Sequence, residues 1–343
     1  MTSHPDSDPR RAELERWLQT LPGPAVTSVT PASGDASFRR YFRVGRGPGS
    51  LIAMDAPPPR EHPGTWLRIN RMMAATGVHV PEVLAAAADQ GFVLMSDLGD
   101  RAYLAALADG EDPEPLYQAA IRALVRLQAA GSAAARELPP YDEARLQAEM
   151  NLFPEWFLAR HLDLTLSAAE QRLIGQTCRQ LCDAALAQPL VFVHRDYHSR
   201  NLMVCPPASP GILDFQDAVC GPISYDLVSL LKDCYIAWPR ARIEGWIDDY
   251  RELAQQAGLE PGPDRPAFLQ WFERMGLQRH LKVLGIFARL WYRDGKPGYL
   301  ADLPLVLDYV LAATQRDPLF HAFNGWLQER VVPAFAPAQR RAP

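Results

Sequence analysis

The sequence predicts an α+β fold with two lobes, a small β-rich N-terminal lobe followed by a large, mainly α-helical C-terminal lobe. Near the start, residues 26–31, 39–44 and 51–54 alternate in the manner of strands, and the turns between them are rich in Gly and Ser. Later, residues 116–130 and 166–186 repeat apolar side chains with the spacing of amphipathic helices. A chain of 343 residues that is 48% hydrophobic is long enough to bury a core in each lobe.

The remaining elements of the first lobe are predicted at 11–21 and 65–76 for helices and at 80–84 and 91–95 for strands. A polar turn follows the last strand, so we place the first lobe at residues 1–96 and the second at residues 97–343. The glycines of Gly45–Gly49 are interpreted as an ordinary hairpin turn, because no helix follows them as a dinucleotide-binding fingerprint requires.

Composition excludes several classes of protein. The net charge of −5 arises from nearly balanced acids and bases, so no basic surface indicates a nucleic-acid partner. The five cysteines include no C-x-x-C pair, and therefore indicate neither a disulfide framework nor a zinc ribbon. The N-terminus lacks the apolar core of a secretory signal, and no apolar stretch is long enough to cross a bilayer. We expect a soluble, cytoplasmic protein without membrane insertion.

The most informative passage is His194–Leu202, which follows an apolar strand at 190–193. Asp196 and Asn201 are spaced as in H-R-D-x-x-x-x-N, and Asp214 comes a short hairpin later. Phosphoryl transfer needs a carboxylate that orients and deprotonates the attacking hydroxyl, together with oxygen ligands that hold Mg²⁺ against the phosphates. We therefore predict Asp196 as the catalytic base and Asn201 and Asp214 as Mg²⁺ ligands. The alternative is that the two aspartates only cap turns between strands.

This passage resembles the aminoglycoside phosphotransferase and choline kinase group, which is similar to protein kinases. His198 resembles the D-x-H-x-x-N form of the small-molecule kinases, and Gln216 stands where protein kinases have the glycine of D-F-G. The resemblance implies a protein-kinase-like fold, ATP as the phosphoryl donor and Mg²⁺ as a cofactor. It also implies structural roles for His194, His198 and Asp226, of which Asp226 braces the catalytic loop through backbone amides.

The resemblance extends to the first lobe. Residues 33–43 resemble the loop that covers the nucleotide, and residues 92–99 resemble the hinge whose backbone meets adenine. The nucleotide-binding residues implied by the resemblance are Ser33, Gly34, Ser37, Arg39, Arg40, Met95, Ser96 and Leu98.

Four stretches narrow the resemblance to the bacterial anomeric sugar kinases of cell-wall recycling, which phosphorylate N-acetylmuramate and N-acetylglucosamine at C1. These stretches are residues 35–41, 53–58, 151–156 and 214–218. The implied activity is ATP-dependent phosphorylation of an amino sugar at its C1 hydroxyl in peptidoglycan recycling. Aminoglycosides or choline-like alcohols are the alternative acceptors.

One departure from the family pattern matters. The family places a phosphate-gripping lysine on its third strand, paired with a glutamate on the next helix, but Leu51–Asp55 contains no lysine and residues 65–76 contain no acid. One interpretation is a nucleotide-binding regulatory pseudokinase. We favour a relocated positive charge, supplied by Arg39 or Arg40, because the base and both predicted metal ligands are intact.

Sugar binding calls for flat apolar surfaces and oriented polar groups. The predicted substrate contacts are Glu149, Asn151, Trp156 and Asp217, with Tyr235 and Trp238 as further candidates that would more ordinarily be core residues.

Overall fold

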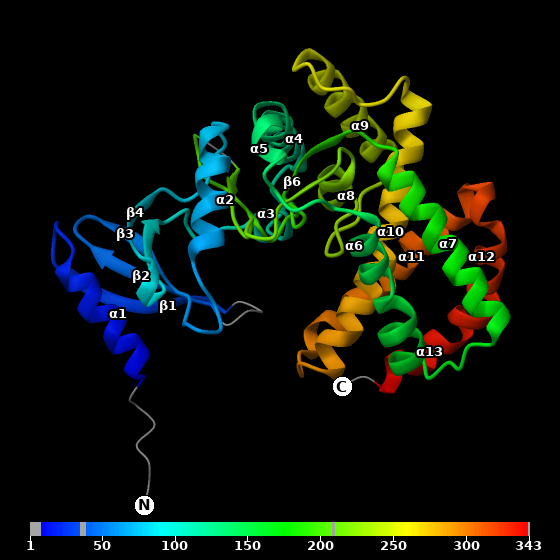
Figure 1. Cartoon of the computed structure of the whole chain (residues 1–343), viewed down its shortest axis with the longest axis horizontal. Helices are drawn as coiled ribbons and strands as arrows, with labels where there is room; N and C mark the ends of the chain where they lie inside the picture. The colour runs from blue at the N-terminus through cyan, green and yellow to red at the C-terminus, as the bar shows by residue number, and fades with distance from the viewer. Residues whose placement is uncertain (1–7, 35–38, 208–209, 342–343) are drawn as a thin grey trace, which may run out of the picture. The chain divides into compact units, whose positions relative to one another are not determined.

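The computed structural model describes residues 8–34, 39–207 and 210–341 (Figure 1). The chain divides into two compact units, Met1–Arg101 with Met203–Gln216, and Ala102–Leu202 with Asp217–Pro343. The β-rich first unit and the helical second unit confirm the predicted α+β fold class. The units do not follow a single cut of the chain, because the short segment Met203–Gln216 belongs to the first unit. The lobe boundary proposed from the sequence, after residue 96, places Met203–Gln216 in the second lobe.

The first unit is built on a five-stranded antiparallel sheet with strand order β1-β2-β3-β5-β4. The strands are β1 (Val26–Gly34), β2 (Arg40–Arg46), β3 (Gly49–Asp55), β4 (Val83–Ala87) and β5 (Phe92–Ser96). The predicted meander at the start of the chain therefore forms. Gly47 has φ of 66° in the β2–β3 turn, a conformation that glycine adopts at no steric cost.

Helix α1 (Pro9–Thr20) contributes Leu14 and Leu18 to the core of this unit. They form one buried cluster with Phe42, Val44, Ala53, Phe92 and Leu94 of the sheet. The side chain of Asp8 accepts a hydrogen bond from the Arg11 amide and so caps the helix, with proline at its first position. The other elements of the unit are α2 (Gly64–Ala75), η1 (Ala88–Gln90) and β8 (Gly211–Ile212), and the two-residue strand β7 (Leu202–Met203) lies at the point where the chain passes from the second unit into the first.

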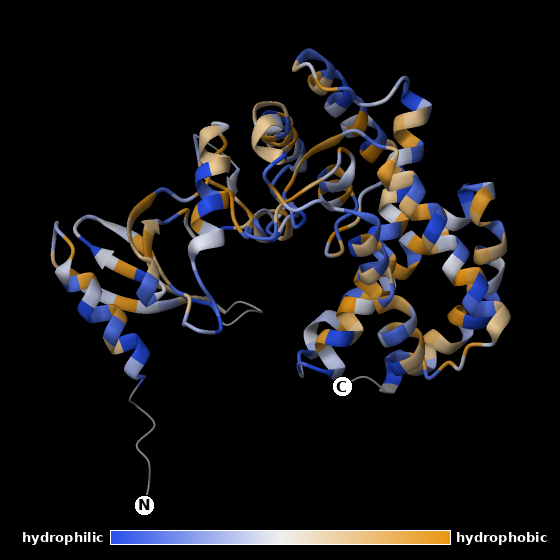
Figure 2. Ribbon diagram, in the orientation of Figure 1, coloured by the Kyte–Doolittle hydropathy of each residue, from blue (hydrophilic) through white to orange (hydrophobic). Residues whose placement is uncertain are grey.

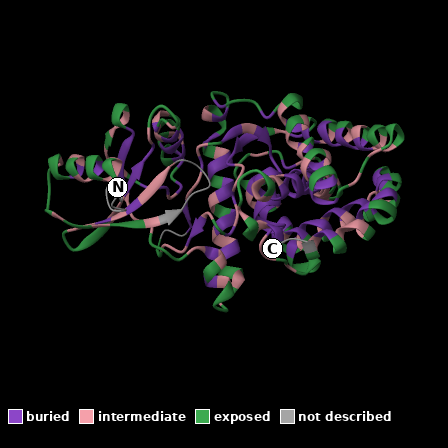
Figure 3. Ribbon diagram, turned by 90° about the horizontal axis from the view of Figure 1, so that it is seen from below, coloured by how far each residue is buried: buried purple, intermediate pink, exposed green. Residues whose placement is uncertain are grey.

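The second unit packs around the long helix α10 (Arg265–Tyr292), which contacts α6, α7, α8, α11, η2 and η3. Its other elements are α3 (Tyr103–Ala108), α4 (Pro113–Ala130), α5 (Ser132–Ala135), α6 (Glu143–Met150), η2 (Phe153–His161), α7 (Ala168–Leu186), β6 (Leu190–Val193), β9 (Val219–Pro222), α8 (Tyr225–Leu231), α9 (Arg240–Gln256), η3 (Pro297–Asp302), α11 (Leu303–Arg316), η4 (Pro318–Phe320), α12 (His321–Trp326), η5 (Leu327–Val331) and α13 (Val332–Arg341). Hydrophobic and hydrophilic residues occupy different faces of many of these helices (Figure 2). Many of these helices likewise carry both buried and exposed residues (Figure 3).

Local sequence explains two boundaries in this unit. Helix α7 begins at Ala168 because Ser167 and Glu170 form a reciprocal capping box. The proline-interrupted segment after α6 continues as the π-helix η2, with Pro154 in its first turn, so it is not a regular α-helix. Among the described residues, no helix combines the length and the apolar character needed to cross a membrane.

Gly285 on α10 lies where this helix packs tightly against the backbone of Leu152, just before η2. A Cβ atom at this position would lie 2.3 Å from the carbonyl carbon of Leu152 and 2.4 Å from its oxygen. Backbone atoms cannot yield as a flexible side chain does, so Gly285→Ala should destabilise the protein by about 1–3 kcal/mol in a denaturant titration. Gly245→Ala on α9, where a Cβ meets nothing within 4 Å, is the matched control and should gain up to about 1 kcal/mol. Equal stability of the two variants would show that this contact is not tight.

Candidate active site

The segment that carries Asp196 begins where strand β6 ends, and buried hydrogen bonds fix its start. Both carboxylate oxygens of Asp226, in the first turn of α8, accept backbone amides, His194 N at 2.7 Å and Arg195 N at 2.9 Å. Asp226 and His194 are fully buried, and Arg195 adopts a left-handed conformation with φ of 80°. A non-glycine residue persists in that region only where its surroundings hold it, and outliers of this kind cluster at functional sites.

Within the loop, Asn201 is tied to Asp196. The side-chain nitrogen Nδ2 of Asn201 donates to the backbone oxygen of Asp196 at 2.9 Å, and the Asn201 amide donates to the His198 carbonyl at 2.9 Å. The Asp196 amide lies 3.2 Å from His194 Nδ1, which accepts its hydrogen bond. Since the side-chain amide of Asn201 donates through its nitrogen, its oxygen Oδ1 is the atom suited to a cation.

A second buried carboxylate, which the sequence analysis missed, holds the far end of the loop. Asp233 accepts hydrogen bonds from the backbone amide of Ser199, at 3.0 Å, and from the Ser199 hydroxyl. It is fully buried and lies just beyond the end of α8. Helix α8 therefore presents one brace for the loop from each of its ends. An acid seven residues after Asp226 was the only available signal for Asp233.

Cationic side chains of the second unit set the charge state of Asp196. Burial would raise the pKa of this carboxyl, but nearby charges outweigh burial and hold the pKa below its usual value. At neutral pH these charges come, in order of size, from Lys282, Arg279 and Arg195, because burial lowers the pKa of His198 and leaves its ring neutral. Asp196 is therefore a carboxylate at neutral pH, which is the form that orients a hydroxyl and accepts its proton.

Glu149, predicted as a substrate contact, lies inside a buried ionic cluster. It pairs with Arg195 and with Lys282 Nζ, the latter at 3.1 Å, and it accepts a hydrogen bond from the Tyr141 hydroxyl. Its side chain is 11% exposed. Burial raises the pKa of Glu149, yet the Lys282 and Arg195 charges hold it below its usual value. These contacts suit a residue that positions Arg195, and its contact with substrate stays a prediction.

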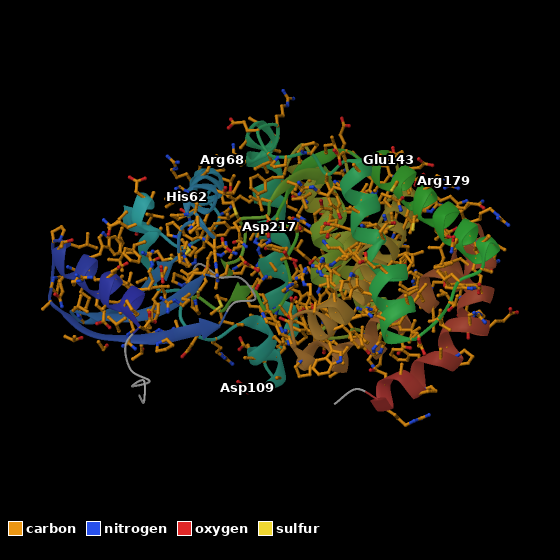
Figure 4. All side chains as sticks on the ribbon, turned by 60° about the horizontal axis from the view of Figure 1, so that its bottom comes forward. His62, Arg68, Asp109, Glu143, Arg179 and Asp217 are labelled. Atoms are coloured by element: carbon orange, nitrogen blue, oxygen red, sulfur yellow. The ribbon has the colours of Figure 1, made fainter. Side chains whose placement is uncertain are left out.

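The other predicted substrate residues lie at separate positions of the second unit. Asn151 is exposed at the end of α6, and its side chain accepts a hydrogen bond from Gln147 Nε2 at 2.9 Å. Trp156 is half-buried on η2. Asp217 has an exposed side chain (Figure 4), and its backbone oxygen lies 3.5 Å from Arg195 Nη1. The contacts of Asn151, Trp156 and Asp217 with a sugar stay predictions.

In the first unit, the predicted phosphate-binding arginines differ in their surroundings. Arg40 pairs with Asp8 and with Asp55, whose fully buried carboxylate lies 2.6 Å from Arg40 Nη2 and 2.8 Å from Arg10 Nε. The charge of Arg40 is thus already matched within its own unit. Arg39 is half-buried directly before β2. Ser33 and Gly34 belong to the end of β1, and Ser37 lies outside the described residues.

The predicted hinge residues of this unit lie on and just after β5. Met95 is buried, and the amide of Ser96 donates to the Glu82 carbonyl at 2.9 Å while its hydroxyl accepts the Glu82 amide at 2.9 Å. The backbone oxygen of Leu98 lies 3.0 Å from Cys205 Sγ.

Asp214, the second acidic residue of the predicted motif, belongs to the first unit. Its backbone is in the left-handed conformation, with φ of 62°. Its Oδ1 accepts a hydrogen bond from Gln216 Nε2 at 2.7 Å. The next residue, Phe215, is buried and packs against Trp66 of α2 with ring centroids 5.1 Å apart. Among the described residues, no cluster of three or more His, Cys, Asp and Glu side chains could hold a metal by itself.

Sequence comparison finds curated relatives that match most of the chain. A relative from Pseudomonas putida named N-acetylmuramate/N-acetylglucosamine kinase is 46% identical over 92% of this chain and 94% of its own. A relative of the same name from Neisseria meningitidis is 44% identical over 90% of this chain and 92% of its own.

Solved structures share the fold at low sequence identity. A choline kinase from Streptococcus pneumoniae has a TM-score of 0.62 at 9% identity, covering 88% of this chain and 99% of its own. A spectinomycin phosphotransferase in complex with AMP has a TM-score of 0.64 at 12% identity, covering 89% of this chain and 98% of its own. The profile of the phosphotransferase enzyme family matches residues 28–269. This match spans both the strand meander and the braced loop around Asp196, and the chain therefore belongs to the phosphotransferase enzyme family.

Proposed function

We infer that this chain phosphorylates an amino sugar, N-acetylmuramate, N-acetylglucosamine or both, with ATP as the donor, in the cytoplasm and as part of peptidoglycan recycling. The observation that carries this inference is the similarity of almost the whole chain to relatives that bear the name of that kinase. The braced loop around Asp196 supports it, because such a loop is what a hydroxyl-phosphorylating enzyme needs.

In the proposed mechanism Asp196 acts on the acceptor. Its carboxylate receives a hydrogen bond from the attacking hydroxyl, orients that oxygen towards the phosphorus and takes up the proton as the new O–P bond forms. The cationic cluster behind Asp196 keeps the carboxylate ionised until the proton arrives. Helix α8 keeps the backbone around it fixed, so little reorganisation is needed during the reaction.

Asn201 and Asp214 are the proposed ligands of Mg²⁺. Oxygen ligands suit this ion, and both residues supply a side-chain oxygen: the donor bond from Asn201 Nδ2 directs its amide, and Gln216 directs the Asp214 carboxylate. When bound, the ion neutralises charge on the phosphates of the nucleotide. The remaining nucleotide contacts are proposed at the covering loop and the hinge, on the family pattern.

The phosphate contact lacks the family's lysine. We propose that Arg39 or Arg40 supplies the relocated charge, with the backbone amides of the covering loop as a second source of positive potential. Arg40 also pairs with Asp8 and Asp55.

The proposed acceptor atom is the oxygen on C1. The ring oxygen withdraws electron density from C1, so this hydroxyl is more acidic than the sugar's other hydroxyls and gives up its proton more readily to a carboxylate. The product expected from either sugar is a 1-phosphate.

A product analysis tests the function. Incubation with ATP, Mg²⁺ and each sugar should give a sugar phosphate that has no reducing end and is hydrolysed by mild acid, as read by mass spectrometry. Methyl glycosides, in which the C1 oxygen is blocked, should not react. A stable 6-phosphate would contradict the anomeric assignment, and absence of ATP consumption with every sugar would favour a regulatory pseudokinase.

Replacement of the base separates chemistry from binding. Asp196→Asn should lower kcat by about 10²–10⁴-fold while the dissociation constant for ATP changes by less than about twofold, because the base touches the acceptor and not the nucleotide. Asp183→Asn, on the exposed face of α7, is the control and should keep full activity. Loss of ATP binding with unchanged turnover in Asp196→Asn would exclude the assigned role.

A further inference from the structure

Arg200 lies in the same loop as Asp196 but takes no part in bracing it. Its side chain is exposed, and its guanidinium carbon lies 3.6 Å from the centre of the Tyr235 ring. At that distance the guanidinium stacks on the face of the ring, which restricts the rotation of a side chain that is otherwise flexible. The loop and the ring therefore hold a positive charge in a defined place, on the residue four positions after the proposed base.

Other aromatic rings of the second unit support Tyr235. His198 meets it edge-on at a centroid distance of 5.5 Å, and Phe287 of α10 lies 6.3 Å away. Tyr299 of η3 packs against Phe287 at 5.2 Å and lies 5.9 Å from the Arg200 guanidinium. Tyr235 and Tyr299 are both half-buried, so the group has an apolar base and a partly exposed side.

In the part of the chain that the structure describes, Arg200 forms no hydrogen bond or ion pair with another side chain. The Arg200 charge lowers the pKa of Asp302, at the end of η3, but burial raises the pKa of this carboxyl by more. A stacked guanidinium presents its N–H groups at its edge, where they match the two oxygens of a carboxylate.

We propose that Arg200, stacked on Tyr235, binds the carboxylate of an acidic acceptor sugar and thereby favours N-acetylmuramate over N-acetylglucosamine. This proposal rests on the proposed function. The two sugars differ in the lactyl ether of N-acetylmuramate, which carries a carboxylate, so one side chain can discriminate between them by charge. Arg200 then determines specificity, and the neutral sugar leaves its donors in water at little cost because the side chain is exposed.

The test compares kcat/KM for the two sugars in Arg200→Gln and in the wild-type protein. For N-acetylmuramate we expect a loss of about 10- to 100-fold, chiefly through KM, as removal of a charge-assisted pair of hydrogen bonds predicts. For N-acetylglucosamine we expect a change of less than about twofold. Arg200→Lys keeps the charge without the planar fork and should recover only part of the loss. Arg172→Gln, an exposed arginine on α7, is the control and should change neither value.

Equal losses with both sugars in Arg200→Gln would overturn the proposal, because they would show an effect on the loop and not on the carboxylate. Unchanged kinetics with both sugars would overturn it as well. Failure of the wild-type protein to phosphorylate either sugar would instead overturn the proposed function, and the specificity of Arg200 with it. The melting temperature of each variant is measured as well. A value equal to that of the wild-type protein shows that the kinetic changes do not come from misfolding.

Discussion

The interaction on which the candidate active site depends is the pair of hydrogen bonds from the His194 and Arg195 amides to the buried carboxylate of Asp226. A buried carboxylate is costly unless its oxygens receive hydrogen bonds, and buried amides are costly unless they donate them. Each group therefore satisfies the other only when the chain leaves β6 in one conformation. Asp233 repeats the arrangement at Ser199. Because both acids flank α8, whose residues are all buried, the loop inherits the rigidity of the core of the second unit.

Fixing the loop in this way also fixes its electrostatics. Arg195, which follows β6 in a left-handed conformation, pairs with Glu149, and Glu149 also pairs with Lys282. The result is a buried cluster with more cationic than anionic groups close to Asp196, and this imbalance keeps Asp196 ionised. Glu149 and Lys282 thus matter to the proposed chemistry without a need to touch the substrate. Arg200 remains outside this network, which leaves its charge for another partner.

Much of this could be predicted from the sequence because the signals are local. The strand meander follows from alternation and turn residues, and the spacing of Asp196, Asn201 and Asp214 within one short passage indicates phosphoryl transfer. The partners of Asp196 could not be predicted, since Lys282 and Arg279 come from a distant helix whose pattern shows only a core-facing stripe. The same holds for the Arg40–Asp55 pair, which depends on strand register. Glu149 was singled out as part of a proline-interrupted segment, but it lies on the regular helix α6, and its burial beside Arg195 is a tertiary feature.

Amide hydrogen exchange tests the bracing of the loop most directly. In the wild-type protein the amides of His194, Arg195 and Ser199 should exchange as slowly as the β6 core, because each is bonded to a buried carboxylate. In Asp233→Asn the Ser199 amide should exchange faster while His194 and Arg195 stay protected, and Asp226→Asn should show the reverse pattern. Fast exchange of all three amides in the wild-type protein, or no response to either substitution, would contradict the account.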